Sequence, residues 1–135
     1  MKRATILFLA LLFVGFAAVA LLAQQFPDIS GTWVGDTDFP NTQEIDHVTL
    51  VLKKAGDSYS GTITVATAKE VALENVKIED EDTFSFAFRM LVGKETVKVT
   101  AKLDVLNDKV MGHKLLGAWT METGEYGSFD LEPKK

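Results

Sequence analysis

The stretch Asp28-Ile29-Ser30-Gly31-Thr32-Trp33-Val34-Gly35 marks the start of a folded β domain. Gly31 and Gly35 bracket a short β-prone run that contains one tryptophan. A glycine beside an inward-facing tryptophan lets a first strand bend while the indole fills the end of a core. Shorter versions of this phrase recur at Gly61-Thr62-Ile63-Thr64, Gly117-Ala118-Trp119-Thr120 and Gly127-Ser128-Phe129-Asp130. The pattern predicts one meander of short strands that begin in similar ways.

The residues before this stretch are typical of an export signal. Lys2 and Arg3 precede an uncharged apolar run from Ala4 to Ala23 that ends in small residues. We therefore expect a signal peptide over 1–23, cut after Ala20 or Ala23, and a single mature domain over 24–135 in a secreted or periplasmic bacterial protein. Retention stays open, because about 20 apolar residues would suffice for an uncleaved membrane anchor.

Composition excludes several classes of function. A chain of 135 residues suits one domain with a core of its own. Without Lys2 and Arg3, the 14 basic residues fall to 12 against 19 acidic ones, a formal charge of −7. This balance argues against nucleic acid and anionic membrane surfaces as partners. The sequence has no cysteine, which excludes disulfides, thiol chemistry and a lipidated N-terminal cysteine.

Alternating apolar and polar residues predict most of the strands. These segments are 45–54, 58–67, 83–91, 95–105, 109–115 with 117–121, and 126–132. The turn formers of 36–42 predict a loop at a barrel mouth. The segment 71–80 is less clear, and a helix over 67–75 is the alternative to a strand there.

Short strands joined by short turns predict an all-β fold, a single antiparallel up-and-down barrel of about eight strands. Lys98 and Lys102 on the outward face argue against an outer-membrane barrel. The predicted inward face is almost wholly apolar. It comprises Trp33, Val48, Leu50, Leu52, Ile63, Val65, Phe84, Phe86, Phe88, Val97, Val99, Leu103, Trp119 and Phe129.

The opening Ile29-Ser30-Gly31-Thr32-Trp33, followed by short alternating strands and the phrase Ser60-Gly61-Thr62, resembles the calycin superfamily. Within it, residues 28 to 132 are most similar to the lipocalin-like domains of secreted bacterial proteins, and avidin-type barrels share the same two phrases. The resemblance implies a calycin-like barrel that binds a small apolar ligand. Biotin is disfavoured because Tyr59 and Thr120 are the main inward polar candidates.

No residue pattern predicts catalysis, a cofactor or a bound metal. The chain has no nucleophile elbow, phosphate-binding glycine loop or zinc-protease motif. Asp46 and His47 are adjacent and point to opposite faces of a strand, which argues against a metal site, and His113 has no neighbouring ligand pair. The acidic turn 79–82 has no spaced ligand loop for calcium.

The leading hypothesis is therefore a secreted, non-catalytic module that binds a small apolar ligand inside the barrel. The expected ligand-binding residues are Trp33, Tyr59, Phe84, Phe86, Phe88 and Trp119. Two alternatives remain open: a structural or protein-interaction β domain with a filled core, and a small barrel isomerase. Cavity volume separates the first two, and the sequence indicates neither that volume nor the oligomeric state.

Overall fold

The computed structural model describes residues 26–39, 44–108 and 112–135. The predicted signal peptide, 1–23, lies outside the described residues. Within the described ranges, no helix is long and apolar enough to cross a membrane. The strands are β1 (Gly31–Phe39), β2 (Glu44–Ala55), β3 (Ser58–Val65), β4 (Val71–Ala72), β5 (Glu74–Ile78), β6 (Thr83–Val92), β7 (Glu95–Asp108), β8 (Gly112–Met121) and β9 (Tyr126–Pro133).

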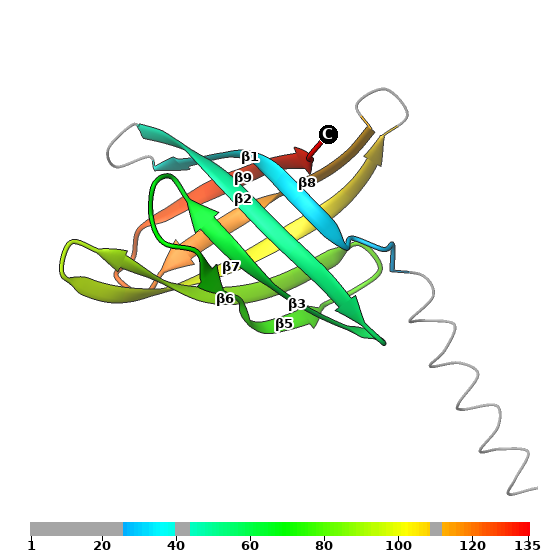
Figure 1. The fold of residues 1–135 in the computed structure, drawn as a ribbon, viewed down its shortest axis with the longest axis horizontal. Coiled ribbons are helices and arrows are strands. Elements are labelled where there is room, and N and C mark those ends of the chain that lie inside the picture. Colours follow the sequence, from blue (N-terminus) through cyan, green and yellow to red (C-terminus); the bar gives the residue numbers. More distant parts are fainter. Residues whose placement is uncertain (1–25, 40–43, 109–111) are drawn as a thin grey trace, which may run out of the picture.

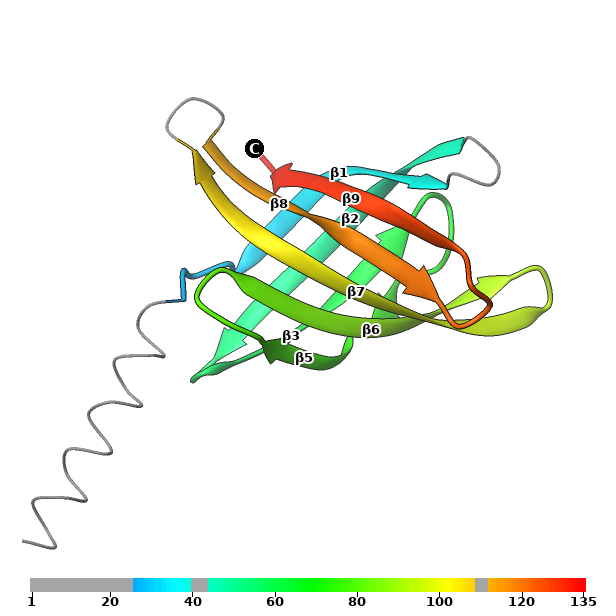
Figure 2. The same ribbon diagram turned by 180° about the vertical axis from the view of Figure 1, so that it is seen from behind.

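These strands form one antiparallel, nearly closed barrel (Figures 1 and 2). The nine-stranded sheet has the order β4-β3-β2-β1-β9-β8-β7-β6-β5. Strands that follow one another in the chain pair with each other, except β4 and β5 at the two edges, and β1 also pairs with β9. The predicted all-β antiparallel barrel is confirmed. The strand number is nine rather than about eight because the segment Val71–Ile78 is divided at Leu73.

The divided segment joins the two edges of the sheet. β4 pairs with β3 through Thr62–Ala72 and Ile63–Val71, and the Leu73 amide donates to the Gly61 carbonyl at 2.9 Å. β5 pairs with β6 instead, with a register irregularity between Glu74 and Lys77. The alternative helix over 67–75 is therefore wrong. Backbone groups in this segment find partners on two neighbouring strands, which a helix would have paired within itself.

The turn predicted over 36–42 is wrong for its first half. β1 continues to Phe39, and Asp36 pairs with His47 on β2 and with Asp130 on β9. Strand ladders on both sides satisfy the backbone, so they outweigh the turn preference of the local residues. Residues 40–42 lie outside the described residues.

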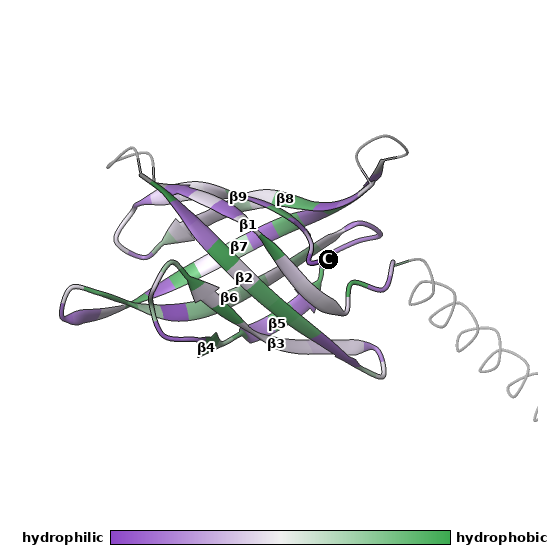
Figure 3. Ribbon diagram, turned by 45° about the horizontal axis from the view of Figure 1, so that its top comes forward, coloured by the Kyte–Doolittle hydropathy of each residue, from purple (hydrophilic) through white to green (hydrophobic). Residues whose placement is uncertain are grey.

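The inward face agrees with the predicted pattern. All residues expected there are buried, and Figure 3 shows hydrophobic and hydrophilic positions alternating along the strands. Ala87, on the outward face of β6, is also buried, and it lies opposite Glu74 of the neighbouring strand β5. Of the two expected inward polar residues, Tyr59 is buried and Thr120 is exposed. Further buried residues are Phe26, Ile29, Ala101, Val105, Leu115, Met121 and Leu131.

Gly35 is required where β1 pairs with β9. A Cβ added there would overlap the backbone carbonyl of Asp130 and approach the Leu131 Cα at 2.9 Å. The two backbones can therefore approach only because this position lacks a side chain. This close approach helps to pair the first and last strands and so to close the barrel.

Candidate ligand-binding end of the barrel

The barrel has two ends that differ in how they are filled. At the plugged end lie the N-terminal segment Phe26–Ser30, the β2–β3 turn and the β5–β6 turn. At the mouth end lie the end of β1, the start of β2 and the connections β3–β4, β6–β7 and β8–β9, on the left in Figure 1. The two ends therefore offer different routes to the interior.

The plugged end is sealed by residues that precede the first strand. The buried ring of Phe26 makes edge contacts with Tyr59 and Phe84, with centroids 6.2 and 6.4 Å apart. The Ile29 amide donates to the Tyr59 hydroxyl at 3.3 Å, and the Trp33 indole donates to the Ile29 carbonyl at 2.9 Å. Burial raises the pKa of Tyr59. Apolar packing and paired polar groups together close this end.

The three phenylalanines of β6 fill the middle of the barrel. Phe84 and Phe86 stack with centroids 6.0 Å apart and an interplanar angle of 27°. Phe86 and Phe88 follow at 6.1 Å and 33°. The three neighbouring rings, each at most 2% exposed, occupy the centre of the barrel between the two ends.

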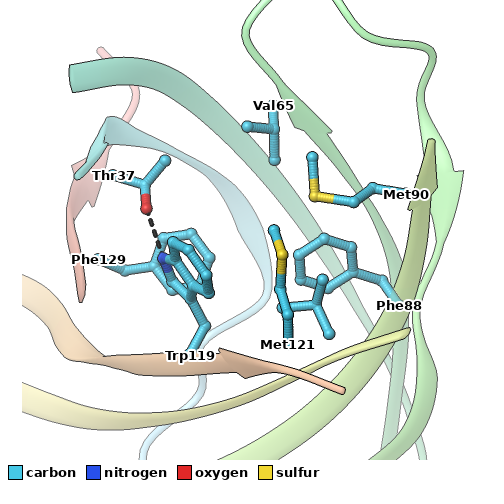
Figure 4. Close-up of a pocket in the computed structure, with 8 residues that line it drawn as sticks. Thr37, Val65, Phe88, Met90, Trp119, Met121 and Phe129 are labelled. Carbon is cyan, nitrogen blue, oxygen red and sulfur yellow. Dashed lines mark hydrogen bonds between the residues drawn. The ribbon is translucent and has the colours of Figure 1, made fainter. Parts of the chain in front are cut away.

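The mouth end contains a small interior void. Its volume is about 10 Å³, near the minimum for a single water molecule. Larger hollows of 340–420 Å³ lie elsewhere: over β1 and β9, over β2 to β4, and beside the N-terminal segment. The void is lined by Thr37, Val65, Phe88, Met90, Val99, Trp119, Met121 and Phe129 (Figure 4).

A chain of hydrogen bonds uses the polar groups beside this void. The Trp119 indole donates to the Thr37 hydroxyl at 2.6 Å, and that hydroxyl donates to the Ser128 carbonyl at 2.8 Å (Figure 4). The Asp38 carboxylate accepts from the Ser128 amide at 2.6 Å and from its hydroxyl at 2.8 Å. These two bonds lower the pKa of Asp38. Because its polar groups bond to one another, the wall of the void is apolar.

The predicted ligand-binding residues are all buried, but the structure does not bring them into one site. Phe88 and Trp119 line the void. Trp33, Tyr59 and Phe84 belong to the plugged end, and Phe86 lies between the two groups.

Sequence reasoning did not select Thr37, Met90 or Met121. The alternation of β6 places Met90 on the same face as Phe84, Phe86 and Phe88, although only the phenylalanines were predicted to bind a ligand. Thr37 had no such signal, because its neighbours are turn formers and its partner Trp119 is 82 residues away.

Groups that could hold a metal do not gather in the part of the chain that the structure describes. No cluster of three or more His, Asp or Glu side chains occurs there. The His47 imidazole lies 3.8 Å from the Asp36 carboxylate, with both side chains about two-thirds exposed at 66%. This pair lies on the outer surface of β1 and β2, away from the void.

Comparison with known proteins supports the fold. No protein-family model matches the sequence, and no curated protein matches it. A solved structure of a redesigned β-barrel is similar, with a TM-score of 0.58 and 14% sequence identity over 84% of this chain and 96% of the other. At this identity the likeness concerns the barrel architecture alone.

Proposed function

We propose that this protein is a non-catalytic binding module that takes a small apolar ligand at the mouth end of its barrel. The difference between the two ends carries the proposal. The plugged end is sealed by Phe26 and the Trp33–Ile29 hydrogen bond. The mouth end has an apolar void whose wall includes Met90 and Met121.

Ligand entry requires movement of side chains, because the void has room for about one water. Methionine suits this role, since its unbranched, polarisable side chain has three rotatable bonds and adapts to different shapes. Met90 is half-buried at the end of β6, so it can turn outward more easily than the fully buried Phe86. We expect a ligand no larger than a short alkyl chain or a single ring.

The proposal includes a calycin-like, lipocalin-like identity and export from the cell. The up-and-down order of the strands and the Gly31-Thr32-Trp33 opening support the first, and the apolar run before Gln24 supports the second. The mass of the intact exported protein tests the location: we expect a chain that begins near Leu21 or Gln24. Recovery of the full-length chain in membranes would contradict it.

Tryptophan emission tests ligand binding. In a Trp33→Phe variant, Trp119 at the void is the remaining tryptophan and reports on the mouth end. We expect octanol to change its emission saturably, with a Kd in the micromolar range, about −8 kcal/mol at 1 μM. Met121→Ala enlarges the site and should tighten binding. Native mass spectrometry of protein from its own host would identify a natural ligand.

A protein-interaction domain is the second candidate, favoured by the filled interior and by exposed apolar side chains at the mouth end. Ile45, Leu91 and Tyr126 are 72%, 65% and 61% exposed. The titration separates the candidates. If wild type binds no probe below millimolar concentration and Phe86→Ala creates binding, the core is simply packed and the interaction domain is preferred.

The void's described lining holds no acid or base, so nothing favours an isomerase.

A further inference from the structure

The charged residues around the mouth end affect which charge the head group of a bound ligand can carry. Apolar lining selects the tail of a ligand and leaves any polar head outside the void. The relevant residues are those of the segments 37–39, 45–46, 66–70, 92–98 and 121–126, which surround this end. Their charged side chains are Asp38, Asp46, Glu70, Glu95, Glu122 and Glu125, against Lys69, Lys94 and Lys98.

Two of these carboxylates belong to the inward face. Asp46 pairs with the buried Thr37 across β1 and β2, so it lies on the same face of the sheet. Glu95 pairs with Val92, which shares its face with Met90. Asp46 lies two residues before the buried Val48, and Glu95 lies two residues before the buried Val97. Each carboxylate therefore occupies the next inward-facing position toward solvent.

The lysines have different positions. Lys98 pairs with Arg89 on the outward face of β6 and β7. Lys94 lies in the β6–β7 turn, and Lys69 lies in the β3–β4 connection. Of the described strand residues at this end, those that carry charge on the inward face are thus acidic.

Two of the remaining carboxylates already have partners in the structure. Asp38 is bonded to Ser128, and Glu122 accepts from the Lys98 amide at 3.0 Å. Glu70 lines the separate hollow over β2 to β4. Asp46, Glu95 and the exposed Glu125 in the β8–β9 turn are therefore the main sources of negative potential toward the void.

We infer that the ligand is a small cationic amphiphile, an amine with a short apolar tail, rather than a fatty acid. The inference rests on the proposed function and specifies its ligand class. The tail displaces the Met90 and Met121 side chains, while the ammonium remains in water near Asp46 and Glu95. A carboxylate head in that place would meet like charges and bind more weakly.

The expected preference follows from Coulomb's law. For two carboxylates at an assumed distance of about 8 Å from the head group in water, Coulomb's law with Debye screening gives a preference for a cation over an anion of about fourfold at 0.15 M salt. At 0.01 M salt, the same estimate rises to about 15-fold. A neutral head group should bind with intermediate affinity at both salt concentrations.

Three probes with one tail test the inference: octylammonium, octanol and octanoate, titrated into the exported protein at both salt concentrations. We expect the affinity order to be ammonium, alcohol, carboxylate, with differences that shrink in salt. Equal affinities would overturn the cationic preference while leaving apolar binding intact. Failure of all three probes would overturn the proposed function itself, so the two failures are distinguishable.

Matched variants locate the effect. Glu95→Lys with Glu125→Lys reverses two exposed mouth charges, and Asp57→Lys with Glu81→Lys makes the same change in total charge at the plugged end. We expect the first pair to invert the order of octylammonium and octanoate and the second to leave it unchanged. If both pairs act equally, total charge alone is responsible and the assignment to the mouth fails. Thermal unfolding of each variant confirms that it is folded.

Discussion

Replacing Trp33 with alanine should remove much of the stability of this domain. Trp33 is 5% exposed, and its indole donates to the Ile29 carbonyl at 2.9 Å. A buried tryptophan removes about 150–250 Å² from water, which at about 25 cal/mol per Å² is worth about 4–6 kcal/mol. Alanine retains part of that burial, so we expect Trp33→Ala to cost about 3–5 kcal/mol.

Trp33→Phe is the matched variant. It keeps an aromatic ring in the core but removes the donor to Ile29, so we expect a loss of about 1–2 kcal/mol. The comparison separates the apolar contribution of the indole from its hydrogen bond. It also provides a folded protein if Trp33→Ala proves too unstable, since total stabilities are only about 5–15 kcal/mol.

Urea unfolding followed by far-ultraviolet circular dichroism measures both losses. With an m-value of about 2 kcal/mol per molar urea, Trp33→Ala should lower the midpoint by about 2 M. Trp119 emission serves as a second, independent probe, because this residue lies at the other end of the barrel. A loss well under 1 kcal/mol for Trp33→Ala would refute the role assigned to the plugged end.

Two further predictions concern the pairing of β1 with β9. Gly35→Ala should destabilise the domain by about 1–3 kcal/mol, because its Cβ would overlap the Asp130 carbonyl; Val34→Ala is the control, and equal losses in the two variants would contradict the steric reasoning. Hydrogen bonds from Ser128 lower the pKa of Asp38, so its stabilisation is complete above its unfolded value near 3.8 and disappears as pH falls through the lower folded value. Wild type should accordingly lose more Tm than Asp38→Asn between pH 6 and pH 2, and parallel curves would refute this.

Local sequence was sufficient for the strands and for the inward face. Strand geometry places successive side chains on opposite faces, so the run from Phe84 to Met90 predicts its buried face without knowledge of any partner. Short turns make sequential antiparallel pairing the simplest arrangement, and the sheet order agrees. The loop predicted over 36–42 was wrong at Asp36–Phe39, where pairing with β2, and for Asp36 and Thr37 also with β9, outweighed local preference.

The candidate site depended on contacts between distant residues. Trp119 and Thr37 are 82 residues apart, and Ser128 and Asp38 are 90 apart. No local pattern encodes such pairs, because they form only when β1, β8 and β9 come together as the barrel closes. The sealing of the plugged end by Phe26 also depends on contacts between distant residues, because its partners Tyr59 and Phe84 lie on β3 and β6.

The sequence by itself thus determined which side chains face inward, because alternation is a property of a single strand. Only the tertiary structure decided how much space those side chains leave and at which end it lies. Interior volume depends on how rings and methionines from all strands interlock, and close packing makes that volume sensitive to each of them. The void of about 10 Å³ beside Trp119 is the result of that packing.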